Sequence, residues 1–235
     1  MRFRTALLLA LLIGAFAPVQ TSAQTFDEDQ LGAWYMYFWN TTVGDGPWGF
    51  QGDAQYRNWD LGGDLEQLLL RGGLTYRPEN SKALLTFGYA NITTGRFGPS
   101  DSTTGEDRTY FEALLPHKVA RRLNLRHRFR FEQRWVEDQD FRTRYRYAIF
   151  ADIALGADAT IAPGDWYLAF YNEIFVNGQR GIGDGRMVEY FDRNRLYGAV
   201  GTVLRNGMKI QGGYMHQATD NVGKGQIQLS LHHNF

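Results

Sequence analysis

The last eleven residues of the chain (GQIQLSLHHNF, residues 225–235) constrain the fold more than any other segment. Successive side chains of a β-strand point to opposite faces, so a period of two means that the two faces meet different environments. One face here is apolar and the other is mostly polar. The length suits a tilted strand that crosses a bilayer, which needs about 9–11 residues. The apolar residues of this alternation are Ile227, Leu229, Leu231 and Phe235.

A terminal strand that ends on Phe also resembles the C-terminal signal by which bacterial outer-membrane barrels are recognised for assembly. The resemblance implies that Ile227, Leu229, Leu231 and Phe235 form an assembly signal. It also implies two partners, outer-membrane lipids and the barrel-assembly machinery, and a location in the outer membrane of a Gram-negative bacterium.

The N-terminal segment is typical of an export signal. Residues 1–4 form a short basic segment with two arginines. Residues 6–17 are almost wholly apolar, and Thr21–Ala23 supply the small residues of a signal-peptidase site. The apolar run is short for a transmembrane helix, although a retained signal anchor is an alternative. We therefore expect a cleaved signal peptide over residues 1–23 and one barrel domain over residues 24–235.

The composition agrees with a membrane barrel and excludes several other classes. Aromatic residues make up 15% of the chain and hydrophobic residues 43%, as expected when half of each strand is apolar and half polar. The absence of cysteine excludes disulfides and thiolate metal sites. The 25 basic and 25 acidic residues cancel, which argues against a nucleic-acid partner.

Period-two segments separated by turn signals predict an up-and-down antiparallel transmembrane β-barrel. We read eleven such segments, at residues 31–40, 48–58, 65–76, 83–93, 108–117, 123–135, 141–154, 166–176, 194–204, 208–217 and 226–235. Bacterial single-chain barrels normally have an even number of strands, so we expect about twelve, within a range of ten to twelve. Eleven would require a parallel closing pair or an N-terminus outside the cell. The first segment is the candidate for lying outside the wall, because it carries aromatic residues on both faces.

The connections between these segments differ in length. Residues 77–82, 119–122 and 205–207 are tight turns, whereas residues 95–107 and 177–192 are long, polar and rich in Gly. Short turns at one end and long loops at the other are typical of an outer-membrane barrel with its long loops outside the cell. A soluble β-sandwich is the alternative, but it explains neither the terminal Phe nor the length of the strands.

Arginine alternates with aromatic residues in the middle of the chain, at residues 126–135 (RHRFRFEQRW) and 142–147 (RTRYRY). An arginine on the lipid face costs about 2–4 kcal/mol at the bilayer midplane, so we expect these arginines to face the lumen. Loop acids such as Glu106 and Asp107 would balance their charge. The predicted lumen-facing charged cluster is Arg57, Arg71, Arg108, Glu112, Arg126, Arg128, Arg130, Glu132, Arg134, Arg142, Arg144, Arg146, Glu173 and Arg195.

Two interpretations of this cluster remain open. In the first, arginines and carboxylates form ion pairs that plug a small lumen and hold the strand register. In the second, the arginines line a narrow path that favours a small anionic solute, because rings of Arg or Lys select anions.

The order of several segments resembles one known family, the domain of unknown function 2490. The resemblance extends from about residue 31 to residue 235 and depends on the ordered set rather than on any single piece. It implies an exported outer-membrane barrel of undefined activity and brings no catalytic residues. The segments that carry it include DAQYRNW (53–59), LLLRGGLTYR (68–77), RHRFRFEQRW (126–135), YNEIFVN (171–177) and FDRNRLYGAVGTVL (191–204).

Enzymatic motifs are weak. Outer-membrane lipid hydrolases resemble one another in a His-x-Ser element, and this chain has only the reverse order, Ser230-Leu231-His232. No spacing resembles a metal-ligand cluster. We therefore expect no catalytic residues, no metal and no cofactor, and a non-enzymatic barrel or narrow anion-favouring pore. The alternatives are a lipid- or envelope-modifying enzyme and a protein that binds or adheres through its outer loops.

Overall fold

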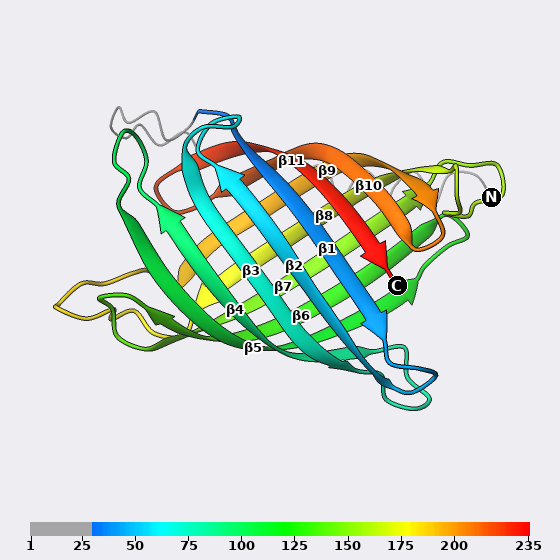
Figure 1. Ribbon diagram of the computed structural model, residues 1–235, viewed down its shortest axis with the longest axis horizontal. Coiled ribbons are helices and arrows are strands. Elements are labelled where there is room, and N and C mark those ends of the chain that lie inside the picture. The colour runs from blue at the N-terminus through cyan, green and yellow to red at the C-terminus, as the bar shows by residue number, and fades with distance from the viewer. Residues whose placement is uncertain (1–29) are drawn as a thin grey trace, which may run out of the picture.

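The computed structural model describes residues 30–235, which form a closed all-β barrel (Figure 1). The predicted signal peptide lies outside the described residues. Within the described range, the wall has eleven strands. They are β1 (Gly32–Thr42), β2 (Trp48–Asn58), β3 (Leu65–Tyr76), β4 (Leu84–Gly95), β5 (Thr103–Lys118), β6 (Leu123–Val136), β7 (Arg142–Ala154), β8 (Trp166–Asn177), β9 (Phe191–Arg205), β10 (Met208–Ala218) and β11 (Gly223–Asn234).

The barrel closes through one parallel pair of strands. β1 and β11 lie side by side with arrowheads pointing the same way (Figure 1), paired from Gly32–Gln226 to Asn40–Asn234. All other neighbouring strands are antiparallel. The all-β barrel is confirmed, and its strand number lies within the expected range. The even strand number expected of a bacterial barrel does not occur among the described strands. An odd number of strands can close the barrel because β1 and β11 pair in parallel.

The suspicion that the first segment lies outside the wall is wrong. β1 pairs with β2 on one side and β11 on the other. Its aromatic residues lie on both faces of the strand. Trp34 is 2% exposed inside the barrel, whereas Tyr35 is 42% exposed on the outer surface. An interior that accepts an aromatic side chain explains the pattern.

The two ends of the barrel carry different connections. We call the end at which β1 begins the N-end and the end at which β11 stops the C-end. The N-end connections are residues 59–64, 96–102, 137–141, 178–190 and 219–222. The C-end connections are residues 43–47, 77–83, 119–122, 155–165 and 206–207. The expected asymmetry is therefore incomplete, because residues 155–165 form a long connection at the C-end.

Strand β5 begins earlier than the alternation predicts. It starts at Thr103, and its pairing with β4 continues as far as Gly95–Thr103. Polar residues at the end of a strand lack an apolar face, yet their backbone can still join the ladder. The predicted loop over residues 95–107 thus shortens to 96–102, and Glu106 belongs to the wall.

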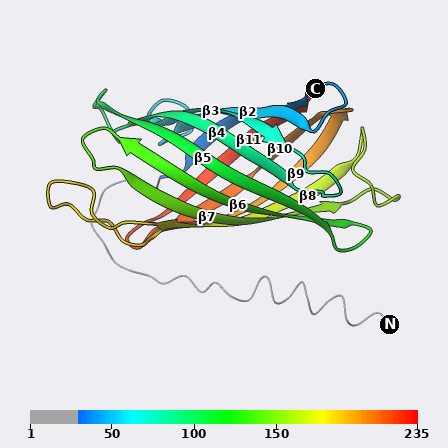
Figure 2. The ribbon, with the colours of Figure 1, turned by 90° about the horizontal axis from the view of Figure 1, so that it is seen from below.

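Most strands separate an apolar outer face from a mostly polar inner one, although buried apolar side chains such as Tyr167 and Ile92 also lie inside. The strands run obliquely to the barrel axis (Figure 2). In β6, Phe129 is 48% exposed while its neighbour Arg130 is 7% exposed. Aromatic side chains pair across strands on the outer face, as in Phe87–Phe111, whose ring centroids are 4.9 Å apart. Such pairs stabilise the sheet beyond the area that they bury. Along residues 30–235, the chain contains no helix long and apolar enough to cross a membrane.

Candidate functional site

The predicted charged cluster lies inside the barrel. Arg71 and Arg128 have side chains that are 7% and 18% exposed, and Arg126, close to the C-end, reaches 34%. The remaining members are each less than one tenth exposed: Arg57, Arg108, Glu112, Arg130, Glu132, Arg134, Arg142, Arg144, Arg146, Glu173 and Arg195.

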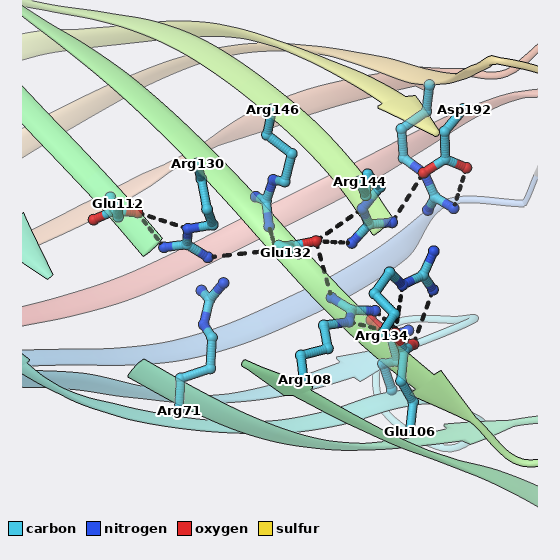
Figure 3. Close-up of polar contacts among 12 residues, drawn as sticks. Arg71, Glu106, Arg108, Glu112, Arg130, Glu132, Arg134, Arg144, Arg146 and Asp192 are labelled. Atoms are coloured by element: carbon cyan, nitrogen blue, oxygen red, sulfur yellow. Dashed lines mark hydrogen bonds and ion pairs between the residues drawn. The ribbon is translucent and has the colours of Figure 1, made fainter. Parts of the chain in front are cut away.

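Glu132 is the centre of an ion-pair network (Figure 3). Its Oε2 accepts hydrogen bonds from Nε and Nη2 of Arg144 at 2.8 and 2.6 Å. Its Oε1 accepts one from Nη1 of Arg146 at 2.6 Å. Guanidinium nitrogens of Arg108 and Arg130 lie 3.9 and 3.8 Å from the same carboxylate. Hydrogen bonds between ionised groups are short and strong, and this carboxylate thus ties together β5, β6 and β7.

The network continues to the N-end through two acids. Nη1 of Arg144 donates to Asp192 Oδ2 at 2.9 Å. Glu106 accepts from Nη2 of Arg108 at 2.6 Å and Nη2 of Arg134 at 3.0 Å. Both acids were expected in loops, and the expectation fails because β5 and β9 begin before the predicted residues. Within a strand, each carboxylate reaches an interior arginine.

Towards the C-end, each carboxylate pairs with one or two arginines, fewer than the four around Glu132. Glu173 Oε1 accepts from Nη2 of Arg128 at 2.7 Å and from Nη2 of Arg146 at 2.6 Å. Glu112 Oε2 accepts from Nε of Arg130 at 2.7 Å. Two separate pairs complete this region, Arg71–Asp53 at 2.8 Å and Arg126–Asp152 at 3.0 Å.

A chamber of about 240 Å³ occupies the interior beside this network. It begins near the C-end, where Phe38 and Ser230 line it, and reaches Trp34 towards the N-end. The charged residues of its lining are three carboxylates (Glu112, Asp152 and Glu173) and six guanidinium groups (Arg57, Arg71, Arg126, Arg128, Arg146 and Arg195). An excess of positive charge in an enclosed lining attracts anions.

Two residues of the interior, Trp34 and Glu66, were not among the charged and polar residues predicted to face the lumen. Trp34 Nε1 donates to Glu66 Oε2 at 3.0 Å, and Gln226 Nε2 donates to the same oxygen at 3.0 Å. A register shift between Arg57 and Asn58 turns the start of β3, so that Glu66 faces inwards beside Gln67. Trp34 lies two residues before Met36, so alternation places both side chains on the same inward face. This spacing could have identified Trp34 as an interior residue.

Ser230 and His232 are in contact inside the chamber. Ser230 Oγ lies 3.0 Å from His232 Nε2, and the histidine ring stacks on Phe38 with centroids 4.9 Å apart. A serine nucleophile needs a base that a third group orients. Among residues 30–235, no carboxylate hydrogen-bonds to His232, and no group of three or more His, Cys, Asp or Glu side chains is placed to hold a metal ion.

Comparison with known proteins gives a family and no closer relative. No curated protein and no solved structure matches the chain. A family model described as "Protein of unknown function (DUF2490)" matches residues 31–228, from β1 into β11, which includes every charged residue of the interior network. The chain therefore belongs to the DUF2490 family.

Proposed function

We propose that the protein is a non-enzymatic outer-membrane β-barrel whose interior is closed in its N-end half by the ion-pair network. The observation that carries the proposal is Glu132, a carboxylate 1% exposed with four guanidinium groups within 4 Å. Removing one partner of a buried ion pair costs about 3–5 kcal/mol, so thermal motion seldom opens such contacts.

The outer face supports the membrane location. Phe87, Phe111 and Tyr145 are each more than half exposed, and they belong to a continuous set of aromatic and aliphatic side chains across neighbouring strands. Exposed apolar surface of this extent is unfavourable in water and favourable in lipid. Outer-membrane lipids are accordingly the proposed partners of this face.

The C-terminal strand supports an orientation. Ile227, Leu229 and Leu231 lie on the outer face of β11, where the barrel-assembly machinery would read them together with Phe235. The C-end would then face the periplasm, as usual for bacterial barrels. In this orientation the chamber opens to the periplasm, and the network closes the route to the outside.

A planar-bilayer recording tests the closed interior. We expect the refolded wild-type barrel to show no conductance steps. The double variant Glu132→Ala/Arg144→Ala removes both partners at the centre of the network and should conduct. The matched control is Arg180→Ala/Glu189→Ala, which removes an exposed loop pair and should stay silent. Heat-modifiable gel mobility verifies that each barrel is folded. Steps from the wild type, or silence from the folded Glu132→Ala/Arg144→Ala variant, would contradict the proposal.

A narrow anion pore is the second candidate, favoured by the six guanidinium groups that line the chamber against three carboxylates. The same recording separates the two. Wild-type steps whose reversal potential in a salt gradient shows anion preference would replace the closed barrel with the pore.

A further inference from the structure

Two arginines at the inner end of the chamber differ from those of the network. Arg57 and Arg195 are 5% and 7% exposed, yet neither forms an ion pair with a carboxylate within residues 30–235. Their guanidinium carbons lie 3.9 and 4.8 Å from the centroid of the Trp34 ring, so two positive charges share one indole.

Neutral groups hold Arg57 in place. Its Nε and Nη2 donate to Gln55 Oε1 at 3.1 and 2.6 Å, and its Nη1 donates to Gln67 Oε1 at 2.6 Å. Amide oxygens accept all three hydrogen bonds. Glu66 and Asp53 are near enough to interact with Arg57 electrostatically, but neither forms an ion pair with it. A buried charge without a direct ion-pair partner is costly, so this site favours a nearby anion.

Arg195 is held in place by contacts that do not use its two terminal Nη groups. Its Nε donates to Gln217 Oε1 at 2.8 Å, and its guanidinium carbon lies 4.8 Å from the centroid of the Trp34 ring and 4.7 Å from that of Phe175. Neither of its Nη groups donates a hydrogen bond to any residue that the structure describes. Contacts with two aromatic rings restrict the guanidinium, and a restricted guanidinium loses little entropy when it binds a ligand.

Further donors reach the chamber from other strands of the wall. Arg71 uses Nε and Nη2 on Asp53, and Arg128 uses Nη2 on Glu173, which leaves the Nη1 of each without an acceptor within the described range. Both arginines line the same chamber as Arg195. Unused charged donors therefore converge on it from β3, β6 and β9.

We propose that the inner end of this chamber binds a small free oxyanion of the phosphate or sulfate class. The two Nη groups of Arg195 would donate to one edge of the anion, a geometry in which guanidinium pairs with oxyanions bidentately. Arg57 would supply the second positive charge. Drug-sized ligands occupy pockets of about 300–1,000 Å³, and this chamber of about 240 Å³ suits a smaller solute.

The inference deepens the proposed function, because it assigns a ligand class to the chamber of the closed barrel. Anion binding depends on the residues of the chamber and not on whether the network closes the barrel. Each of the two proposals can therefore fail without the other. A binding measurement in detergent micelles is independent of whether the barrel conducts.

Isothermal titration calorimetry of the refolded full-length protein with inorganic phosphate tests the site. Hydrogen bonds to charged groups contribute about 1.5–3 kcal/mol, so Arg195→Gln should weaken phosphate binding at least about tenfold. Arg195→Lys keeps the charge without the fork and should fall between the two. The matched control is Arg142→Gln: Arg142 is 8% exposed, forms no ion pair within residues 30–235 and does not line the chamber. Its loss should change the affinity less than about twofold, since it removes only a distant charge.

Three outcomes would overturn the site. The first is a wild type that binds neither phosphate nor sulfate at about 10 mM, beyond which an affinity carries little specific energy. The second is an equal affinity of the wild type and folded Arg195→Gln, or, if that variant does not fold, of the wild type and Arg195→Lys. The third concerns the source of the phosphate group: tighter binding of dihexanoylphosphatidylglycerol than of inorganic phosphate would assign the chamber to a lipid headgroup.

Discussion

The barrel interior holds arginines in two settings, and the difference between them separates structural support from ligand binding. Around Glu132, guanidinium groups share carboxylates, and the pairs connect neighbouring strands near the N-end. Beside Trp34, Arg57 and Arg195 are held by amide oxygens and aromatic rings. In the first setting, each of these guanidinium groups has a carboxylate partner. The second leaves charge and donors available, which is what an anion site requires.

The network gives the largest expected effect. Glu132→Gln keeps the shape of the side chain but removes the charge shared by Arg144 and Arg146. Breaking a buried pair leaves uncompensated charge, so the free energy of unfolding should fall by about 3–5 kcal/mol. Urea unfolding in lipid vesicles, followed by tryptophan fluorescence, measures the change.

The control for that variant is Glu189→Gln. Glu189 pairs with Arg180 in an exposed loop, at 2.7 Å. Exposed pairs contribute about 0–1 kcal/mol, so this variant should unfold almost as the wild type does. Equal losses from the two variants would remove the distinction between a supporting network and surface charge.

The unpaired arginines should respond in a different way. In phosphate-free buffer, Arg195→Gln loses cation–π contacts but relieves uncompensated charge, and the free energy of unfolding should change by less than about 1 kcal/mol. Added phosphate should stabilise the wild type by about 2.7 kcal/mol at 100 times its dissociation constant. It should leave Arg195→Gln nearly unchanged. A phosphate-free loss as large as that of Glu132→Gln would mean that Arg195 supports the fold as the network does.

The fold could be predicted from the sequence to the extent that alternation determines it. Alternation identified all eleven described strands and separated Phe129 from Arg130 because the outer surface and the interior of the barrel impose opposite preferences. It missed the start of β5, where polar residues extend the ladder without an apolar face. It left the closure undecided between a parallel pair and an even strand number, because pairing of the first and last strands depends on their edges and not on their faces.

The site was less predictable, because its contacts depend on register and closure. Alternation indicates that Arg144 and Glu132 face inwards, but only the register places them directly opposite each other. The cluster of Trp34, Arg57 and Arg195 combines β1, β2 and β9, and β9 comes near β1 only because the barrel closes. A sequence pattern therefore finds the arginines and cannot tell the paired from the unpaired.

The carboxylate of Asp60 lies outside the barrel interior, and its replacement should have the smallest effect on stability. It serves as the baseline for the two interior settings of arginine. In the connection between β2 and β3, Asp60 Oδ1 accepts from the backbone N–H groups of Gly63 at 2.7 Å, Gly62 at 2.9 Å and Asp64 at 3.1 Å. These hydrogen bonds hold the pKa of Asp60 below its usual value. The ionised carboxylate thus contributes stability above the unfolded-state pKa of about 3.9 and loses it as the pH falls through the lower folded-state value.

Asp60→Asn should consequently lower the thermal midpoint slightly at pH 7, and the difference from the wild type should close as the pH falls below about 4. Calorimetric scans at several pH values measure it. Asp45→Asn is the control, since Asp45 lies in an exposed turn and its carboxylate accepts no hydrogen bond within residues 30–235. A difference that persists at low pH would show that the amide disturbs the turn itself. Because no arginine holds Asp60, a small and pH-dependent effect here would confine the large charge effects to the barrel interior.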